Sequence, residues 1–122
     1  MELYPEECCG ALVGESDRVD HAVRLANTSE NDRRRSYRID PDELLSLTRQ
    51  VQSHGTRILA IYHSHPDSEP CFSDQDAANA CPWYRFLIVS VRGGRVGAAR
   101  CYQAGAEPGR FTQVEFKIEQ AS

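Results

Sequence analysis

Short apolar stretches separated by glycines and polar turns dominate the chain and predict several β-strands. The segment 9–14 is an apolar run bounded by glycines, which is typical of a buried strand. The segment 19–25 alternates loosely between apolar and polar residues, as expected of its hairpin partner. Gly93 and Gly94 predict a turn between two further strands. The remaining strands are predicted at 37–39, 57–62, 86–91, 96–102 and 111–118.

One segment has the spacing and the boundary residues of a helix. Asp40 is a natural N-cap, Pro41 suits the first helical position, and Glu43 stands three residues after the cap. Gly55 is placed to end this helix. Its apolar face is expected to consist of Leu44, Leu45, Leu47 and Val51.

A second, short helix is predicted to begin at Ser73 and to end near residue 80, before Pro82. The order of elements is therefore strands, helix, strand, short helix and strands. This order predicts an α+β fold with a mixed central sheet packed with helices.

Length, charge and cysteine content narrow the class of protein. The chain has 122 residues, enough for one domain spanning 1–122. Its net charge of −4 disfavours nucleic-acid binding, and the short arginine cluster at 33–35 is expected to lie in a solvated loop. No apolar run is long enough to span a membrane, and the acidic N-terminus does not resemble a secretory signal. The five cysteines are an odd number and none form a CxxC pair. Because no secretory signal is recognised, we expect reduced thiols and a cytoplasmic protein.

Two histidines at the end of the predicted strand 57–62 are the main chemical signal. Residues i and i+2 of a strand point to the same face, so His63 and His65 can converge on one ion. Neutral imidazole is a favoured zinc ligand. Ser64 then points to the other face, and Pro66 is expected to end the strand. Two protein ligands do not complete a catalytic zinc site, which usually has three and a water molecule.

Asp76 is the best third ligand, because the first turn of the predicted helix can bring it back over the end of the strand. As a plain residue, Asp76 would be an acidic side chain favoured in the first turn of a helix, and Ser73 would be an ordinary N-cap. Cys71 is a competing ligand, since a thiolate also binds zinc and could displace Asp76 or the water. His21 and His54 belong to no motif and are expected at the surface.

The joint pattern of these residues resembles the signature of the JAMM (MPN-domain) metallopeptidases. His63-Ser64-His65-Pro66 matches the His-x-His-Pro part of that signature. Seven residues separate His65 from Ser73, and Asp76 follows three residues after Ser73, as the family has it.

The resemblance also covers the start of the chain. The segment 4–14 is similar to the first strand of the family, in which a glutamate stands three residues before a glycine. This alignment selects Glu7 rather than its neighbour Glu6. The resemblance thus extends over about residues 4–91. Only six residues precede Glu7, too few for the helix that usually stands there in the family, so we expect that helix to be absent.

The resemblance implies a fold and a role for each residue. The fold is an MPN domain, with an architecture similar to that of cytidine deaminases. One Zn²⁺ ion is implied to bind to His63, His65 and Asp76. Glu7 is implied to take a proton from the zinc-bound water and pass it to the departing amine, and Ser73 to donate a hydrogen bond to the oxyanion.

The segment 40–76 has no room for a long insertion, which makes the chain similar to small prokaryotic members associated with ubiquitin-like sulfur carrier proteins. We therefore expect a zinc peptidase or isopeptidase that cleaves after the C-terminal Gly-Gly of a ubiquitin-like or sulfur carrier protein. One alternative is a non-catalytic MPN-type scaffold that binds such a partner. A zinc deaminase is disfavoured, because its paired-cysteine motif does not occur around His63. The sequence leaves the oligomeric state open.

Overall fold

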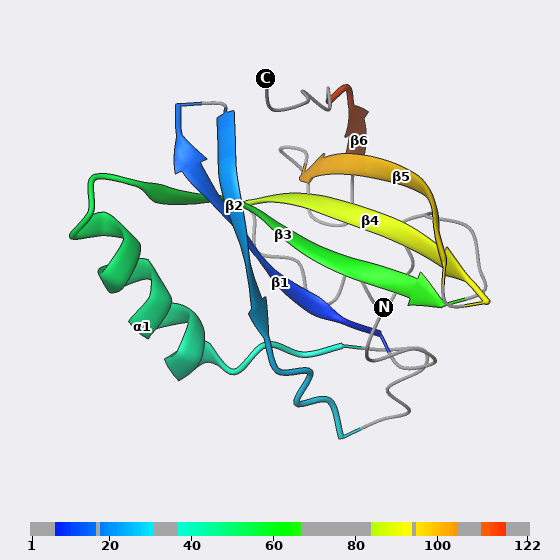
Figure 1. The fold of residues 1–122 in the computed structure, drawn as a ribbon, viewed down its shortest axis with the longest axis horizontal. Coiled ribbons are helices and arrows are strands. Elements are labelled where there is room, and N and C mark those ends of the chain that lie inside the picture. The colour runs from blue at the N-terminus through cyan, green and yellow to red at the C-terminus, as the bar shows by residue number, and fades with distance from the viewer. Residues whose placement is uncertain are drawn as a thin grey trace.

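The computed structural model describes residues 7–16, 18–30, 37–66, 84–93, 95–104 and 111–116. Within these ranges the chain forms six strands and one helix (Figure 1). In chain order they are β1 (Cys9–Glu15), β2 (Arg18–Leu25), α1 (Pro41–Gln52), β3 (Arg57–Pro66), β4 (Arg85–Arg92), β5 (Arg95–Ala104) and β6 (Phe111–Val114). The predicted α+β class with a mixed sheet is confirmed.

The strands form one sheet in the order β2-β1-β3-β4-β5-β6. The neighbours β3 and β4 run parallel, and all other neighbouring pairs are antiparallel. The predicted hairpins β1–β2 and β4–β5 are both present. Strand β1 is paired on both sides, with Cys9 opposite Leu25 of β2 and opposite His63 of β3. The start of β1 and the end of β3 therefore lie at the same end of the sheet.

Helix α1 has the predicted boundaries. The Asp40 side chain accepts a hydrogen bond of 2.9 Å from the backbone N–H of Asp42, which satisfies one of the free donors of the first turn. At the other end, Gly55 has a φ of 76°, and the N–H of Thr56 donates to the carbonyl of Val51 at 3.0 Å. Gly55 thus takes the left-handed conformation in the turn that ends the helix after the C-cap Ser53, so the predicted role of Gly55 is confirmed.

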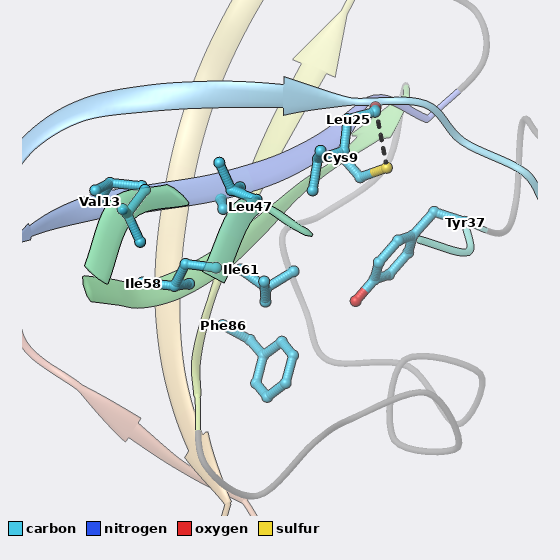
Figure 2. Packing of buried hydrophobic residues seen from close by; sticks show 10 residues of the cluster. Cys9, Val13, Leu25, Tyr37, Leu47, Ile58, Ile61 and Phe86 are labelled. Atoms are coloured by element: carbon cyan, nitrogen blue, oxygen red, sulfur yellow. Dashed lines mark hydrogen bonds between the residues drawn. The ribbon is translucent and has the colours of Figure 1, made fainter. Parts of the chain in front are cut away.

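The core lies between α1 and the part of the sheet that α1 covers (Figure 2). Leu47 and Val51 of the helix pack in one cluster with residues of strands β1, β2, β3 and β4. The strand residues of this cluster are Cys9, Ala11, Val13, Leu25, Ile58, Ile61 and Phe86. Cys9, Ala11 and Val13 of β1 follow the period of two of a half-buried strand, whereas Ile58 and Ile61 of β3 are three positions apart because the register of the β1–β3 pair shifts between Leu12 and Val13.

Three details differ from the sequence predictions. Residues 37–39 form no strand, because the backbone there bonds to the segment 27–28 and leads into the helix cap. Leu45 remains 49% exposed and is not part of the apolar face of α1. Strand β6 ends at Val114, and Glu115 and Phe116 lie outside it. The predicted helix starting at Ser73, with Pro82, lies outside the described residues, as do the residues before Glu7.

Among the described residues, no helix is long and apolar enough to cross a membrane.

Candidate metal centre

The site is built where the first residues of β1 meet the last residues of β3. The Ser64 backbone N–H donates to the Cys8 carbonyl at 2.9 Å, and the Cys8 N–H donates to the Ser64 Oγ at 2.8 Å. Ser64 thus points away from its neighbouring histidines, as predicted, and fixes the chain just before β1. This pairing places Glu7 beside the end of β3.

Two imidazoles and one carboxylate converge at this end of the sheet. One carboxylate oxygen of Glu7 and one ring nitrogen of each histidine, His63 and His65, lie within 4.8 Å of one another. The Nε2 atoms of the two histidines are 3.1 Å apart, and their ring planes are tilted by 53°. The two rings therefore point their Nε2 atoms at a common place instead of stacking on each other.

All three side chains of this group are withdrawn from solvent. The exposed fraction is 3% for Glu7, 0% for His63 and 9% for His65. Burying an ionisable group costs free energy unless a hydrogen bond, an opposite charge or a metal compensates. A carboxylate and two imidazoles buried together are therefore a feature that function explains better than stability does.

The donor set and its spacing fit a zinc ion. Two nitrogen ligands at about 2.0–2.1 Å from a tetrahedral zinc lie roughly 3.3–3.4 Å apart, a few tenths of an ångström more than the separation of the His63 and His65 Nε2 atoms. The nearby Glu7 carboxyl group offers an oxygen donor next to this position. The two histidines can thus serve as ligands with only a small adjustment.

Tyr37 stacks on the first histidine. The ring centroids of Tyr37 and His63 are 4.2 Å apart, and the two planes differ by 20°. Tyr37 is 4% exposed and belongs to the core cluster drawn in Figure 2. A flat ring against the imidazole restricts its rotation about χ2, so the stack helps to aim the His63 Nε2 at His65. Sequence reasoning missed this role, although an aromatic residue just before a helix cap was visible.

Asn27 connects the two sides of the site, and sequence reasoning missed it too. Its Nδ2 donates to the carbonyl of Glu7 at 3.0 Å. Its Oδ1 accepts from the backbone N–H groups of Ser29 and Arg38, each at 3.1 Å. Arg38 follows Tyr37 directly. The Asn27 carboxamide therefore bonds to the backbone at Glu7 and next to Tyr37.

Comparison with known proteins identifies the family. Residues 1–104 match the family model described as prokaryotic homologs of the JAB domain. The chain belongs to this family. The match covers most of the chain and confirms the resemblance that the histidine and glutamate motifs indicated.

Two curated relatives are similar to this chain in sequence. A desampylase from Haloferax volcanii is 37% identical over 91 residues, which cover 73% of this chain and 66% of the relative. A CysO-cysteine peptidase from Mycobacterium tuberculosis is 30% identical over 103 residues, which cover 82% of this chain and 69% of the relative. The chain thus spans about two thirds of the length of these relatives.

Solved structures support the same fold. A solution structure of a protein from Salinibacter ruber is 30% identical, has a TM-score of 0.70, and covers 93% of this chain and 78% of its own. A JAB1/MPN domain protein from Archaeoglobus fulgidus has a TM-score of 0.61 at 18% identity, with 98% of this chain and 85% of its own covered. At that identity the second likeness shows the fold alone.

The structure of this JAB-family chain describes only some of the predicted site residues. The structure brings Glu7, His63 and His65 together, as the motif required. Ser73, Asp76 and the competing ligand Cys71 lie outside the described residues. Their positions stay predictions. His21 and His54 are exposed, as expected.

The thiols of the described residues lie in the interior of the protein. Cys8, Cys9 and Cys101 are free and buried. The Cys9 Sγ donates to the Leu25 carbonyl at 3.6 Å (Figure 2). Burial raises the pKa of the Cys9 thiol to about 12. A thiol with so high a pKa is a poor nucleophile at neutral pH.

Proposed function

We propose that this chain is a zinc-dependent peptidase of the JAMM type that acts on a ubiquitin-like or sulfur carrier protein. The bond cleaved is the peptide or isopeptide bond that follows the carrier's C-terminal Gly-Gly. The observation that supports this proposal most directly is the buried group of Glu7, His63 and His65 at one end of the sheet. The names of the relatives, desampylase and CysO-cysteine peptidase, support the class of substrate.

In this proposal His63 and His65 hold one Zn²⁺ ion together with Asp76. When bound, the ion supplies Lewis acidity, which polarises a carbonyl and lowers the pKa of water to about 7. The fold contributes two imidazoles that are already oriented, because β3 fixes their backbones and Tyr37 packs on the His63 ring. Preorganised ligands need little rearrangement to bind the ion.

Glu7 is proposed as the group that moves protons. Its carboxylate oxygen lies within 4.8 Å of a nitrogen of each histidine, so a water molecule held between them is within its reach. Glu7 would accept the proton of the attacking water and deliver it to the departing amine. Ser73 is proposed to donate a hydrogen bond to the oxyanion that forms in between.

The same distance also permits Glu7 to be a metal ligand, so the experiment must separate the two roles. We suggest mass spectrometry of a carrier protein extended by one residue past Gly-Gly, with zinc stoichiometry measured on each variant. Glu7→Gln is expected to lower kcat about 10²–10⁴-fold and to retain one zinc ion. Glu6→Gln is the matched control and should leave both quantities unchanged.

Each outcome has a meaning. Loss of zinc in Glu7→Gln would make Glu7 a ligand. Equal activity of Glu7→Gln and wild type would remove Glu7 from its role. Wild-type protein that binds the carrier but neither holds zinc nor cleaves would be the non-catalytic scaffold. Asp76→Asn and Ser73→Ala test the two residues outside the described ranges: the first should lose zinc, and the second should lose activity with zinc retained.

The proposed compartment is the cytoplasm, and the state of the described cysteines agrees with it. The three described cysteines are free. Reduced thiols are the usual state in a cytoplasm, where we propose that the enzyme meets its carrier protein.

A further inference from the structure

The carboxamide of Asn27 lies between two segments that are far apart in sequence. On one side its Nδ2 bonds to the carbonyl of Glu7, twenty positions earlier. On the other side its Oδ1 bonds to the N–H of Arg38, eleven positions later. A third bond, from the Ser29 N–H to the same Oδ1, holds the carboxamide in its own loop. The group is thereby fixed in plane and direction.

Both segments bear a side chain of the site. Glu7 itself is the proposed proton carrier, and its carbonyl is the atom that Asn27 holds. Arg38 follows Tyr37, whose ring lies flat on the His63 imidazole. The Thr28 N–H and Oγ1 also bond to the Arg38 carbonyl, at 2.8 and 3.0 Å, so the segment of Tyr37 is attached at two points. The two sides of the site thus share one anchor.

We propose that Asn27 is a positioning residue that holds the Glu7 carboxylate and the His63 imidazole in one relative geometry. It acts on Glu7 directly through the backbone and on His63 through Tyr37. This inference rests on the proposed function, because it assigns Asn27 to that same site.

The chemistry of the amide explains why asparagine suits this position. A carboxamide donates from its nitrogen and accepts at its oxygen, and both are needed here. An aspartate has the same shape but accepts only, so it would keep the bonds from Ser29 and Arg38 and lose the bond to the Glu7 carbonyl. The substitution Asn27→Asp therefore tests the bond to Glu7 separately from the bonds to Ser29 and Arg38.

The test compares Asn27→Asp and Asn27→Ala with wild type. For Asn27→Asp we expect kcat to fall on the order of 10–100-fold with KM and zinc affinity nearly unchanged, because only the Glu7 arm is lost. For Asn27→Ala we expect zinc affinity, measured by competition with a chelator, to fall on the order of 10–100-fold as well. Thr28→Ala is the matched control, since it removes only the exposed Oγ1 bond to Arg38 and leaves the Thr28 N–H bond and the carboxamide in place, so it should leave kcat and zinc affinity unchanged.

A second readout does not depend on activity. In metal-free protein, the ring protons of His63 lie over the Tyr37 ring and should have upfield NMR shifts. These shifts should persist in Asn27→Asp, in Thr28→Ala and in Tyr37→Phe, and move toward ordinary values in Asn27→Ala and Tyr37→Leu. If Asn27→Ala does not fold, the Asn27→Asp result still decides the Glu7 arm.

Failure of this inference differs from failure of the proposed function. An active zinc enzyme in which Asn27→Asp keeps full kcat would overturn the positioning role of Asn27. Upfield shifts that persist in Asn27→Ala would overturn its link to the stack. A wild-type protein without zinc or hydrolysis would instead refute the proposed function, and the NMR experiment would still report on the stack.

Discussion

Strands β1 and β3 have two parts on the same face of the sheet, and the two parts are buried for different reasons. In their middle, Ala11 and Ile61 pair across the strands and pack under α1 in the apolar cluster. Two positions further along β3, His63 and then His65 replace the apolar residues, and Glu7 lies beside them. All these side chains are at most 9% exposed.

Burial has opposite effects on the free energy of folding in the two parts. Apolar burial contributes to folding, at about 25 cal/mol per Å² of surface removed from water. Burial of a carboxylate and two imidazoles opposes folding unless they are compensated. Proteins usually accept such local conflicts at functional sites. Substitutions in the two parts should therefore have opposite profiles of activity and stability.

The largest expected effect is on activity, from His65→Ala. Loss of a zinc ligand removes several kcal/mol of transition-state stabilisation, roughly a 10³-fold loss of kcat/KM or more. The free energy of unfolding of the metal-free protein should not fall by more than about 1 kcal/mol, because His65 lies at the rim of the core. Carrier cleavage and urea unfolding with a chelator present measure the two quantities. A large loss of metal-free stability in His65→Ala would contradict the different roles assigned to the two parts.

Ile61→Ala should show the reverse profile. Truncation of a buried isoleucine leaves a cavity and lowers the free energy of unfolding by about 2–5 kcal/mol. Zinc content and kcat of the folded fraction, measured at low temperature, should stay near wild type. Ile61→Val is the graded control, with a cost of about 0.5–1.5 kcal/mol. A loss of kcat larger than the loss of folded protein would mean that the two parts are not separable.

A smaller effect is expected at the cap of α1. Asp40→Ala removes the acceptor for the Asp42 N–H and should lower the free energy of unfolding by about 1 kcal/mol. Asp40→Asn keeps an acceptor and should recover most of this stability. Thermal unfolding of the three proteins, followed by circular dichroism, is sufficient. A drop in zinc affinity in Asp40→Ala would show that the cap also fixes the nearby Tyr37.

The smallest effect concerns pH and the thiol of Cys101. Burial raises its pKa, although the nearby Arg85 lowers it in part. Above the ordinary thiol pKa, the unfolded chain loses a proton that the folded chain keeps, so the free energy of unfolding falls as pH rises through that range. Urea unfolding at pH 8 and pH 10 should show this fall, and Cys101→Ala should make it shallower. An equal slope in both proteins would contradict the assignment to Cys101.

The sequence predicted the parts of the fold that local patterns determine. Strand alternation, the Asp40 cap and Gly55 gave the helix and most strands, because each depends on neighbouring residues. The motif predicted that Glu7 acts beside the two histidines; the structure brings these three residues together, and their catalytic and ligand roles stay predictions. Neither the Tyr37 stack nor the Asn27 anchor could be predicted, since both depend on contacts between distant segments. Leu45 was misassigned because periodicity does not show where the sheet stops covering the helix.

Gly10, three residues after Glu7, lies where the neighbouring strands leave no space for a side chain, and this limits how such chains can diverge. A Cβ at this position would clash with the carbonyl oxygen of Val23 and with the hydroxyl of Tyr62. Shortening Tyr62 would relieve only the second clash, because the first involves the backbone of β2. A larger residue at position 10 would therefore require the backbone of β2 to shift. We expect evolutionary drift to be blocked there, which makes this glycine a useful marker when distant members are aligned.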